Sequence, residues 1–347
     1  MTGGRRARAV AAIAAFLVAV PAVADRPPGD PVAWLTRMTA ALERVNYTGT
    51  LVELDDDGAS VMRVVHRYDG STATERLTAL DDVGREIIHR GNEVTAILPD
   101  QRAVLVDRRD DVLPPASPIR NRFPGTLAVP AAHYRLAAGP GGDLLGRATW
   151  RVEVRPLDGL RYGYRLWLDE ATAIPLKVQV VGEDGAILEQ VLFAEIRFDE
   201  PVPAAAVEPT ALTDGFAVRD GAGGAGPAAG TSSPDGGHWV AERLPPGFAL
   251  RAVRSKAGRM TGARLLQLVY SDGVASVSVF VEPEPEPEPV TAPAPDAAPA
   301  AGAASRLGAD SVYTRVVDGR RITAMGEVPA RTAELIARAM RPAPAVR

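Results

Sequence analysis

The sequence contains no cysteine, and this absence removes several chemistries at once. Without thiols there is no disulfide framework, no Cys-ligated zinc, no iron–sulfur cluster, no thiol nucleophile and no lipidated N-terminal cysteine. The four histidines are scattered with no metal-ligand spacing. Lysine is nearly absent too, since Lys177 and Lys256 are the sole lysines among 39 basic residues. We interpret this scarcity as an Arg-for-Lys bias in composition and not as a nucleic-acid footprint.

Enzyme signatures are also missing from the sequence. There is no HExxH, GxSxG or P-loop motif and no cysteine to pair with a histidine. The carboxylate clusters at 55–57 and 81–82 lie in predicted turns, where solvation explains them better than acid–base or metal chemistry. His66 lies in the middle of a predicted strand and is expected to be a hydrogen-bonded sheet histidine. The sequence therefore predicts a non-catalytic protein that needs neither a metal nor a cofactor.

The first 24 residues have the pattern of a signal peptide. Basic residues (Arg5, Arg6 and Arg8) precede an apolar run over 10–20, and Ala22-Val23-Ala24 supplies a small-x-small cleavage signal. The run is too short for a spanning helix, which needs about 20 residues. Removing the three arginines leaves 36 basic against 43 acidic residues, a net charge of −7. The pattern predicts an exported protein, cleaved near Ala24, whose net negative charge disfavours general binding to nucleic acid.

Residues 25–216 are expected to form a first domain dominated by antiparallel strands. Asp30-Pro31 is typical of a helix start, and apolar residues at helical spacing predict an amphipathic helix over 31–45. Short β-type runs then alternate with closely spaced turn residues, which favours hairpins over βαβ units. The predicted strands span 47–54, 60–68, 72–79, 84–90, 93–98, 103–107, 148–155, 160–169, 175–182 and 186–198.

Two features of this domain point weakly to a binding cleft. The strand 186–198 carries apolar residues on both faces, and a sheet of that kind needs cover on both. The loop 108–130 is rich in proline and arginine and places Phe123 beside Arg120 and Arg122. Guanidinium groups next to an apolar surface would suit an amphiphile with an anionic head group. Pairing of these arginines with Asp110 and Asp111 is an equally good explanation.

A second, smaller α+β domain is expected over 238–347, after a flexible Gly/Ala/Ser-rich linker at 217–237. Strands are predicted at 262–271, 274–282, 311–318 and 320–326, with a closing helix at 330–341 that presents Leu335, Ile336, Ala339 and Met340 on one side. A Glu-Pro and Ala-Pro tract, 282–305, is expected to be a disordered insertion. The strand 274–281 could accept a partner strand if it lies at a sheet edge, and would be core if it is central.

The chain resembles the MucB/RseB family over nearly all of its mature length and in the same order. The resemblance is carried by short segments spread over both domains: Tyr47-Thr48-Gly49-Thr50-Leu51, 163–169 with Pro175-Leu176-Lys177, Leu188-Glu189-Gln190 with Phe193, 244–248, 270–280 and Gly326-Glu327-Val328-Pro329.

The resemblance implies a half-open antiparallel β-barrel wrapped on helices, like the LolA/LolB lipoprotein carriers, followed by the smaller domain. It also implies a periplasmic negative regulator of the envelope-stress sigma-E/AlgU pathway. Such a protein binds the periplasmic part of an RseA/MucA-type anti-sigma factor and shields it from site-1 proteolysis. It releases that partner on sensing lipopolysaccharide or lipoprotein. It would be peripheral to the inner membrane through its partner, with homo-oligomers possible. The alternative is a lipid or lipoprotein carrier of the LolA type without a signalling partner.

On this basis we expect two sets of contact residues. Candidate lipid contacts are Trp34, Met38, Leu42, Phe123, Tyr162, Tyr164, Leu166, Phe193, Arg120 and Arg122. Candidate contacts to the anti-sigma factor are Tyr270, Val274, Val277, Val279 and Phe280.

Overall fold

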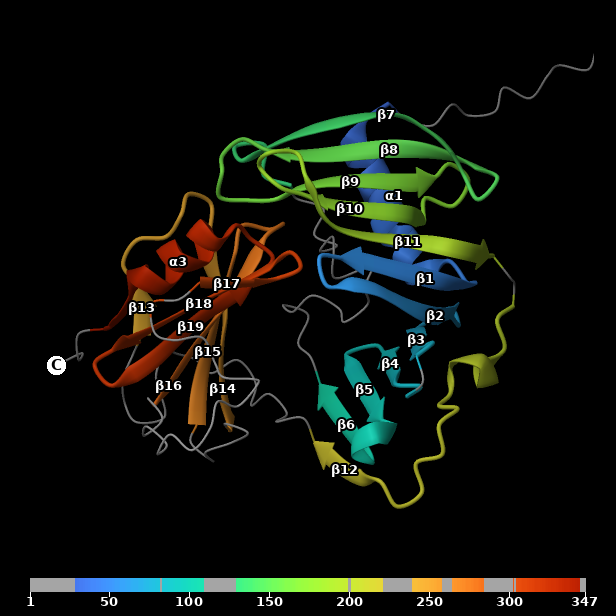
Figure 1. Cartoon of the computed structure of the whole chain (residues 1–347). Coiled ribbons are helices and arrows are strands. Elements are labelled where there is room, and N and C mark those ends of the chain that lie inside the picture. The colour runs from blue at the N-terminus through green and yellow to red at the C-terminus, as the bar shows by residue number, and fades with distance from the viewer. Residues whose placement is uncertain are drawn as a thin grey trace, which may run out of the picture.

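The computed structural model describes residues 29–81, 83–108, 129–198, 201–220, 239–257, 264–283, 302 and 304–343. The predicted signal peptide and most of the predicted linker and insertion lie outside these residues. The described chain forms a large twelve-stranded sheet, a six-stranded sheet and a two-stranded sheet. The six-stranded sheet lies at one end of the large one (Figure 1).

The first domain is a single open sheet of antiparallel neighbours, apart from one parallel pair at its edge. Its order is β12-β6-β5-β4-β3-β2-β1-β11-β10-β9-β8-β7, and β12 pairs in parallel with β6. Because β7 and β12 do not pair with each other, the barrel stays open, as expected. The strands are β1 (Tyr47–Asp55), β2 (Gly58–Tyr68), β3 (Ala73–Ala79), β4 (Glu86–Arg90), β5 (Glu93–Leu98), β6 (Ala103–Arg108), β7 (Tyr134–Leu144), β8 (Arg147–Pro156), β9 (Gly163–Asp169), β10 (Pro175–Val181), β11 (Ile187–Arg197) and β12 (Ala217–Asp220).

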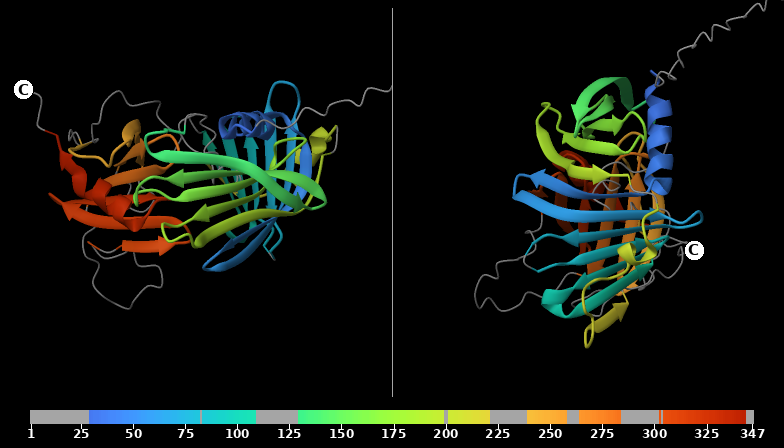
Figure 2. Two further views of the ribbon diagram at one scale, coloured as in Figure 1. Left: turned by 90° about the horizontal axis from the view of Figure 1, so that it is seen from above. Right: turned by 90° about the vertical axis from the view of Figure 1, so that its right-hand side faces the viewer.

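The helix α1 (Pro31–Arg44) lies against the inner face of this curved sheet (Figure 2). It begins as predicted, because the Asp30 side chain accepts a hydrogen bond from the Val32 amide at 3.0 Å and Pro31 occupies the first helical position. Its buried stripe consists of Trp34, Leu35, Met38, Ala41 and Leu42. The helix ends at Arg44, and its apolar stripe provides the cover that the inner face of the sheet requires.

Two bulges in β11 explain why its apolar residues do not follow a simple alternation along the sequence. The pairing with β10 skips Leu188, and the pairing with β1 skips Ala194. A bulged residue shifts the alternation of side chains by one position. As a result Phe193 and Ile196 both pack on the inner cluster, although residues three positions apart lie on opposite faces of a regular strand. Ile187 is not part of this cluster and is half exposed.

A strap formed by residues 201–216 covers the outer face beyond β2. Val202 and Val207, the latter in the short helix η2 (Ala204–Val207), bury Val65. Further along, the buried carboxylate of Glu86 accepts hydrogen bonds from Thr210 and from the amide of Ala211. The strap then leads into β12, so that the first residues of the predicted linker are the edge strand of the large sheet.

The second domain packs one helix on a six-stranded antiparallel sheet of order β14-β15-β16-β19-β18-β17. The small sheet β13-β20 joins the two ends of this domain. The elements are β13 (Trp239–Ala241), β14 (Ala249–Ala257), β15 (Arg264–Ser271), β16 (Ser276–Pro283), β17 (Ala304–Leu307), β18 (Asp310–Val317), β19 (Arg320–Gly326), α3 (Ala330–Ala339) and β20 (Met340–Pro342).

The helix α3 differs in detail from the prediction. It ends at Ala339, and Met340 begins β20 instead of extending the helix. The grouping of Leu335 with Ile336 and Met340 on one side is wrong, since Leu335 is exposed while Ile336 and Met340 are buried. The other buried side chains of the helix are Thr332, Ala333 and Ala337. The ends of the predicted insertion are also ordered, because its first two residues belong to β16 and its last two to β17.

Candidate functional site

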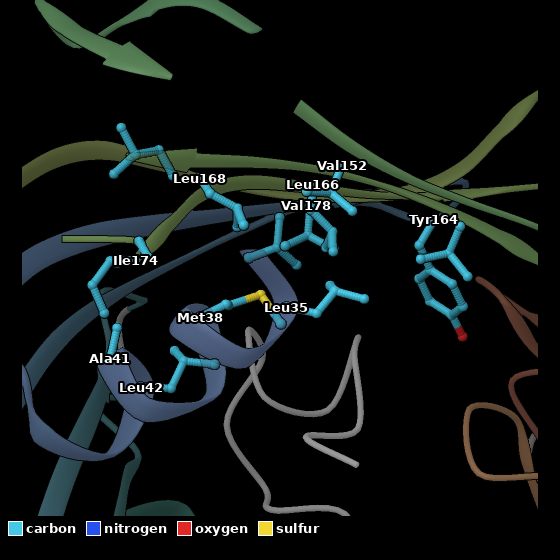
Figure 3. Packing of buried hydrophobic residues seen from close by; sticks show 14 of the residues in the cluster. Leu35, Met38, Ala41, Leu42, Val152, Tyr164, Leu166, Leu168, Ile174 and Val178 are labelled. Atoms are coloured by element: carbon cyan, nitrogen blue, oxygen red, sulfur yellow. The ribbon is translucent and has the colours of Figure 1, made fainter. Parts of the chain in front are cut away.

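The expected lipid contacts form one apolar cluster between α1 and the inner face of the large sheet. Seven of the ten are buried in it, namely Trp34, Met38, Leu42, Tyr162, Tyr164, Leu166 and Phe193. Figure 3 shows side chains of α1 pointing at those of β8, β9 and β10. In this structure they fill the space between helix and sheet, so that the cluster is a packed core and not an open cleft. Phe123, Arg120 and Arg122 lie outside the described residues.

A polar row crosses the same inner face beside this apolar cluster. The strand register places Tyr47, His66, Glu75 and His89 side by side on β1 to β4. The Tyr47 hydroxyl donates to Glu75 Oε2 at 3.1 Å, and the His66 ring stacks on Tyr47 with 5.0 Å between centroids. His66 Nδ1 also bonds the carbonyl of Val45 at 2.8 Å, which confirms the predicted sheet histidine. Among the described residues, no group of three or more His, Asp or Glu side chains is placed to hold a metal ion.

A buried charge pair joins the two domains where β9 begins. The Arg161 guanidinium donates through Nε to Asp272 Oδ2, and both side chains are 0% exposed. Arg161 also donates to Asp158 at 2.6 Å and to the carbonyl of Pro246. The Tyr134 hydroxyl completes the site by donating to Asp272 Oδ2 at 3.0 Å. We call Tyr134, Asp158, Arg161 and Asp272 the interdomain latch.

Asp272 also shapes the turn that carries it. Its second oxygen, Oδ1, accepts from the amides of Val274 at 2.8 Å and Ala275 at 2.9 Å. One carboxylate therefore fixes the β15–β16 turn with one oxygen and holds the first domain with the other. The short-range signal Ser271-Asp272-Gly273 predicted the turn, but no local pattern could reveal the partner 111 residues away.

Two side chains of the latch, Tyr134 and Arg161, have shifted pKa values. Burial and the negative charge of Asp272 raise the pKa of the Tyr134 hydroxyl far above its usual range. Burial lowers the pKa of Arg161, but the hydrogen bond and charge of Asp272 outweigh it and raise the pKa overall. The docked domains thus favour the neutral Tyr134 hydroxyl and the charged Arg161 guanidinium.

A second group of contacts surrounds the latch. The Tyr164 hydroxyl donates to Glu327 at 2.6 Å, and the Thr332 hydroxyl donates to the carbonyl of Leu160 at 2.7 Å. Burial and then Glu327 raise the pKa of Tyr164 well above its usual value. The side chains of Val274 and Ala309, both from the second domain, are buried in the apolar cluster of the first. The two domains therefore share a continuous interior at this end of the large sheet.

Most of the residues expected to contact the anti-sigma factor are buried and not on the surface. β16 is a central strand between β15 and β19, which excludes the addition of a partner strand to it. Tyr270, Val277 and Val279 are buried in the core of the second domain, and Val274 packs into the first. Phe280 alone of the five is half-buried, on the sheet face opposite that core.

A cavity of about 430 Å³ lies next to the latch, at the ends of β8, β9 and β10. Its lining combines charged residues with apolar ones, namely Glu153, Arg155, Asp158, Arg165 and Glu183 with Val154, Pro156, Leu157 and Val181. Sequence reasoning did not identify this cavity, because its walls come from strand ends and loops that the fold brings together.

Family models match almost the whole described chain. The MucB/RseB N-terminal domain matches residues 30–211 and the MucB/RseB C-terminal domain matches residues 233–341. The chain belongs to the MucB/RseB family. It is 29% identical to the Sigma factor AlgU regulatory protein MucB of Pseudomonas aeruginosa over 334 residues, 94% of each chain. It is 26% identical to the Sigma-E factor regulatory protein RseB of Escherichia coli K12 over 312 residues, 88% of each chain.

Solved MucB/RseB-family structures share the fold of both domains. The complex of Pseudomonas aeruginosa MucA and MucB has a TM-score of 0.66 at 27% identity and covers 91% of this chain and 100% of that one. The structure of MucB in complex with MucA(peri) has a TM-score of 0.65 at 26% identity, with the same coverage of both chains. These relatives are named as regulatory proteins. Among the described residues no helix is long and apolar enough to cross a membrane.

Proposed function

We propose that this protein is a periplasmic negative regulator that binds the periplasmic part of a membrane-anchored anti-sigma factor. The observation that carries the proposal is the likeness to MucB in its complex with MucA, which extends over both domains and 91% of the chain. The bound anti-sigma factor would be shielded from its site-1 protease. The signal-peptide pattern at 1–24 supports export to the compartment that holds that segment.

The release signal in this proposal is an amphiphile, lipopolysaccharide or lipoprotein, that binds the first domain. Support comes from the apolar cluster between α1 and the sheet, which has the composition of a site for acyl chains. The adjacent polar row of Tyr47, His66 and Glu75 offers hydrogen-bonding groups on the same face. Some of the side chains that fill this space must move to admit a ligand.

The anti-sigma factor is assigned to the second domain. Of the side chains expected to contact it, Phe280 can reach a partner without unfolding the domain, since it lies outside the core. Phe280→Ala should therefore weaken binding to the anti-sigma segment while the melting temperature stays within about 2 °C of the unmodified protein. Val277→Ala provides the matched control, because it should lower stability without removing a surface contact.

A truncation tests the assignment at the level of domains. Binding of the anti-sigma segment to residues 25–237 and to residues 25–347 can be compared by titration calorimetry, with circular dichroism to check that the shorter chain is folded. The proposal predicts loss of binding in the shorter chain. Full affinity in residues 25–237 would overturn the placement of the partner.

The alternative is a lipid carrier without a signalling partner. The second domain argues against it, since a carrier has no need of residues 239–343 docked on its ligand-binding domain. Retained affinity for acylated ligands with no binding to the anti-sigma segment would favour the carrier.

A further inference from the structure

We propose that the docked second domain closes the open end of the apolar cluster in the first domain, so that docking and acyl-chain binding exclude each other. The inference rests on the proposed lipid binding and adds to it the way in which the ligand is sensed. A ligand would act by displacing the second domain, and the partner would then respond to that displacement.

Two turns of the second domain supply the apolar part of this closure. Val274, in the β15–β16 turn, is 3% exposed, and Ala309, in the β17–β18 turn, is 0% exposed. Both belong to the cluster formed by α1 and the large sheet, and neither belongs to the core of their own domain. The space that they fill is therefore continuous with the space assigned to acyl chains.

Tyr164 connects the apolar cluster directly to the second domain. Its ring is part of the cluster, together with Leu166 on the same strand, and its hydroxyl donates to Glu327. Figure 3 shows the ring pointing away from α1, with its hydroxyl toward a segment of the second domain. A chain that enters the cluster at Tyr164 must move the ring and so break the bond to Glu327. Binding at the cluster is thereby coupled to a polar interdomain contact.

The latch disfavours positions of the second domain between fully docked and fully separated. Arg161 and Asp272 are fully buried while the domains are together, and partial separation would leave Asp272 without its cationic partner and Arg161 with Asp158 alone. Intermediate positions are thus unfavourable, and the molecule is expected to be either docked or separated. A ligand can shift such an equilibrium only by binding one state better than the other. An acyl chain that needs the space of Val274 and Ala309 would bind the separated state better.

The absence of cysteine allows a direct test by cross-linking. A Cβ atom built on Gly308 lies 3.6 Å from Cβ of Asp55, across the domain interface. Disulfides need a separation of about 3.5–4.5 Å between these atoms. The double variant Asp55→Cys/Gly308→Cys should therefore form a disulfide that holds the domains in the docked state. Gly308 has a φ of +56°, so the single variant Gly308→Cys is required to control for backbone strain.

The measurement is binding of lipopolysaccharide and of a fluorescent fatty acid to full-length mature protein, in the oxidised and the reduced double variant. We expect the reduced form and the Gly308→Cys control to bind like the unmodified protein, and the oxidised form to lose at least tenfold in affinity. Equal binding by oxidised and reduced forms would overturn the closure and leave lipid binding intact. If the latch variant Asp272→Ala and all other forms fail to bind either probe, lipid binding fails and the closure fails with it.

Discussion

Arg161 is a buried cation whose partners come from both domains. It is fully buried, and it donates to two carboxylates and one carbonyl from both domains. Its guanidinium also lies over the rings of Phe248 and Tyr134, at 5.1 and 5.7 Å from their centroids. A buried cation of this kind is tolerable only with its full set of partners.

Removal of one partner should therefore be costly. We predict that Asp272→Ala lowers the free energy of unfolding by about 3–5 kcal/mol, or separates the domains to relieve Arg161, because the remaining charge loses its buried counter-ion. Calorimetric unfolding measures the first outcome and small-angle scattering the second.

The matched control is the exposed interdomain pair of Arg306 and Asp56, at 2.7 Å. Arg306→Ala should cost less than about 1 kcal/mol, because water solvates both groups when they separate. Equal effects of Asp272→Ala and Arg306→Ala, in both calorimetry and scattering, would show that the latch does not hold the domains.

At the scale of elements, local patterns predicted most strands of the twelve-stranded and six-stranded sheets, and the strands that they missed have physical causes. β7 was missed because residues 139–142 are Gly-Pro-Gly-Gly, and it is a strand nevertheless because an edge tolerates proline and a bulge. β12 was missed because four residues inside a Gly-rich stretch form a strand only through pairing with β6. The bulges at Leu188 and Ala194 depend on partner strands and left no local signal in β11.

The candidate site was also predictable only in part. The apolar members of the lipid cluster could be predicted, because they recur at helix and strand spacing. The latch, the polar row and the cavity beside the latch could not be predicted, since each arises from strand register or from contacts between distant segments. The position of β16 in its sheet likewise decided between the edge and core interpretations of 274–281, in favour of core.

The central position of β16 gives a prediction for the element. Val279→Asp should abolish cooperative unfolding of the second domain and its binding to the anti-sigma segment, because it places a charge in a fully buried site. Near-ultraviolet circular dichroism and calorimetry would detect the loss. Met325→Asp on the neighbouring strand β19 is the control, since Met325 is exposed and a charge there meets water. A folded Val279→Asp variant with unchanged melting temperature would contradict the assignment of β16 to the core.

At the scale of the whole molecule, domain docking should weaken in alkaline solution. Tyr134 and Tyr164 each donate a proton to a carboxylate of the second domain, and burial raises the pKa of both hydroxyls. A group whose folded-state pKa is raised contributes its full stability below the ordinary tyrosine pKa of about 10, and that contribution falls as the pH rises toward the raised value. Deprotonation would place a phenolate against Asp272 or Glu327.

This effect can be followed by resonance energy transfer between dyes on the two domains from about pH 8 to pH 11. We expect a loss of transfer above about pH 10 in the unmodified protein. The loss should be smaller in the Tyr134→Phe/Tyr164→Phe variant, which has no such protons to release. Identical profiles for the two proteins would show that these tyrosines do not link docking to pH.

The most direct test of the account as a whole is titration calorimetry of residues 25–347 against the periplasmic segment of the anti-sigma factor, with and without lipopolysaccharide. We predict micromolar or tighter binding that lipopolysaccharide weakens, as expected for a regulator whose ligand frees its partner. Absence of binding to the segment, with retained affinity for acylated ligands, would contradict it and assign the protein to the lipid carriers.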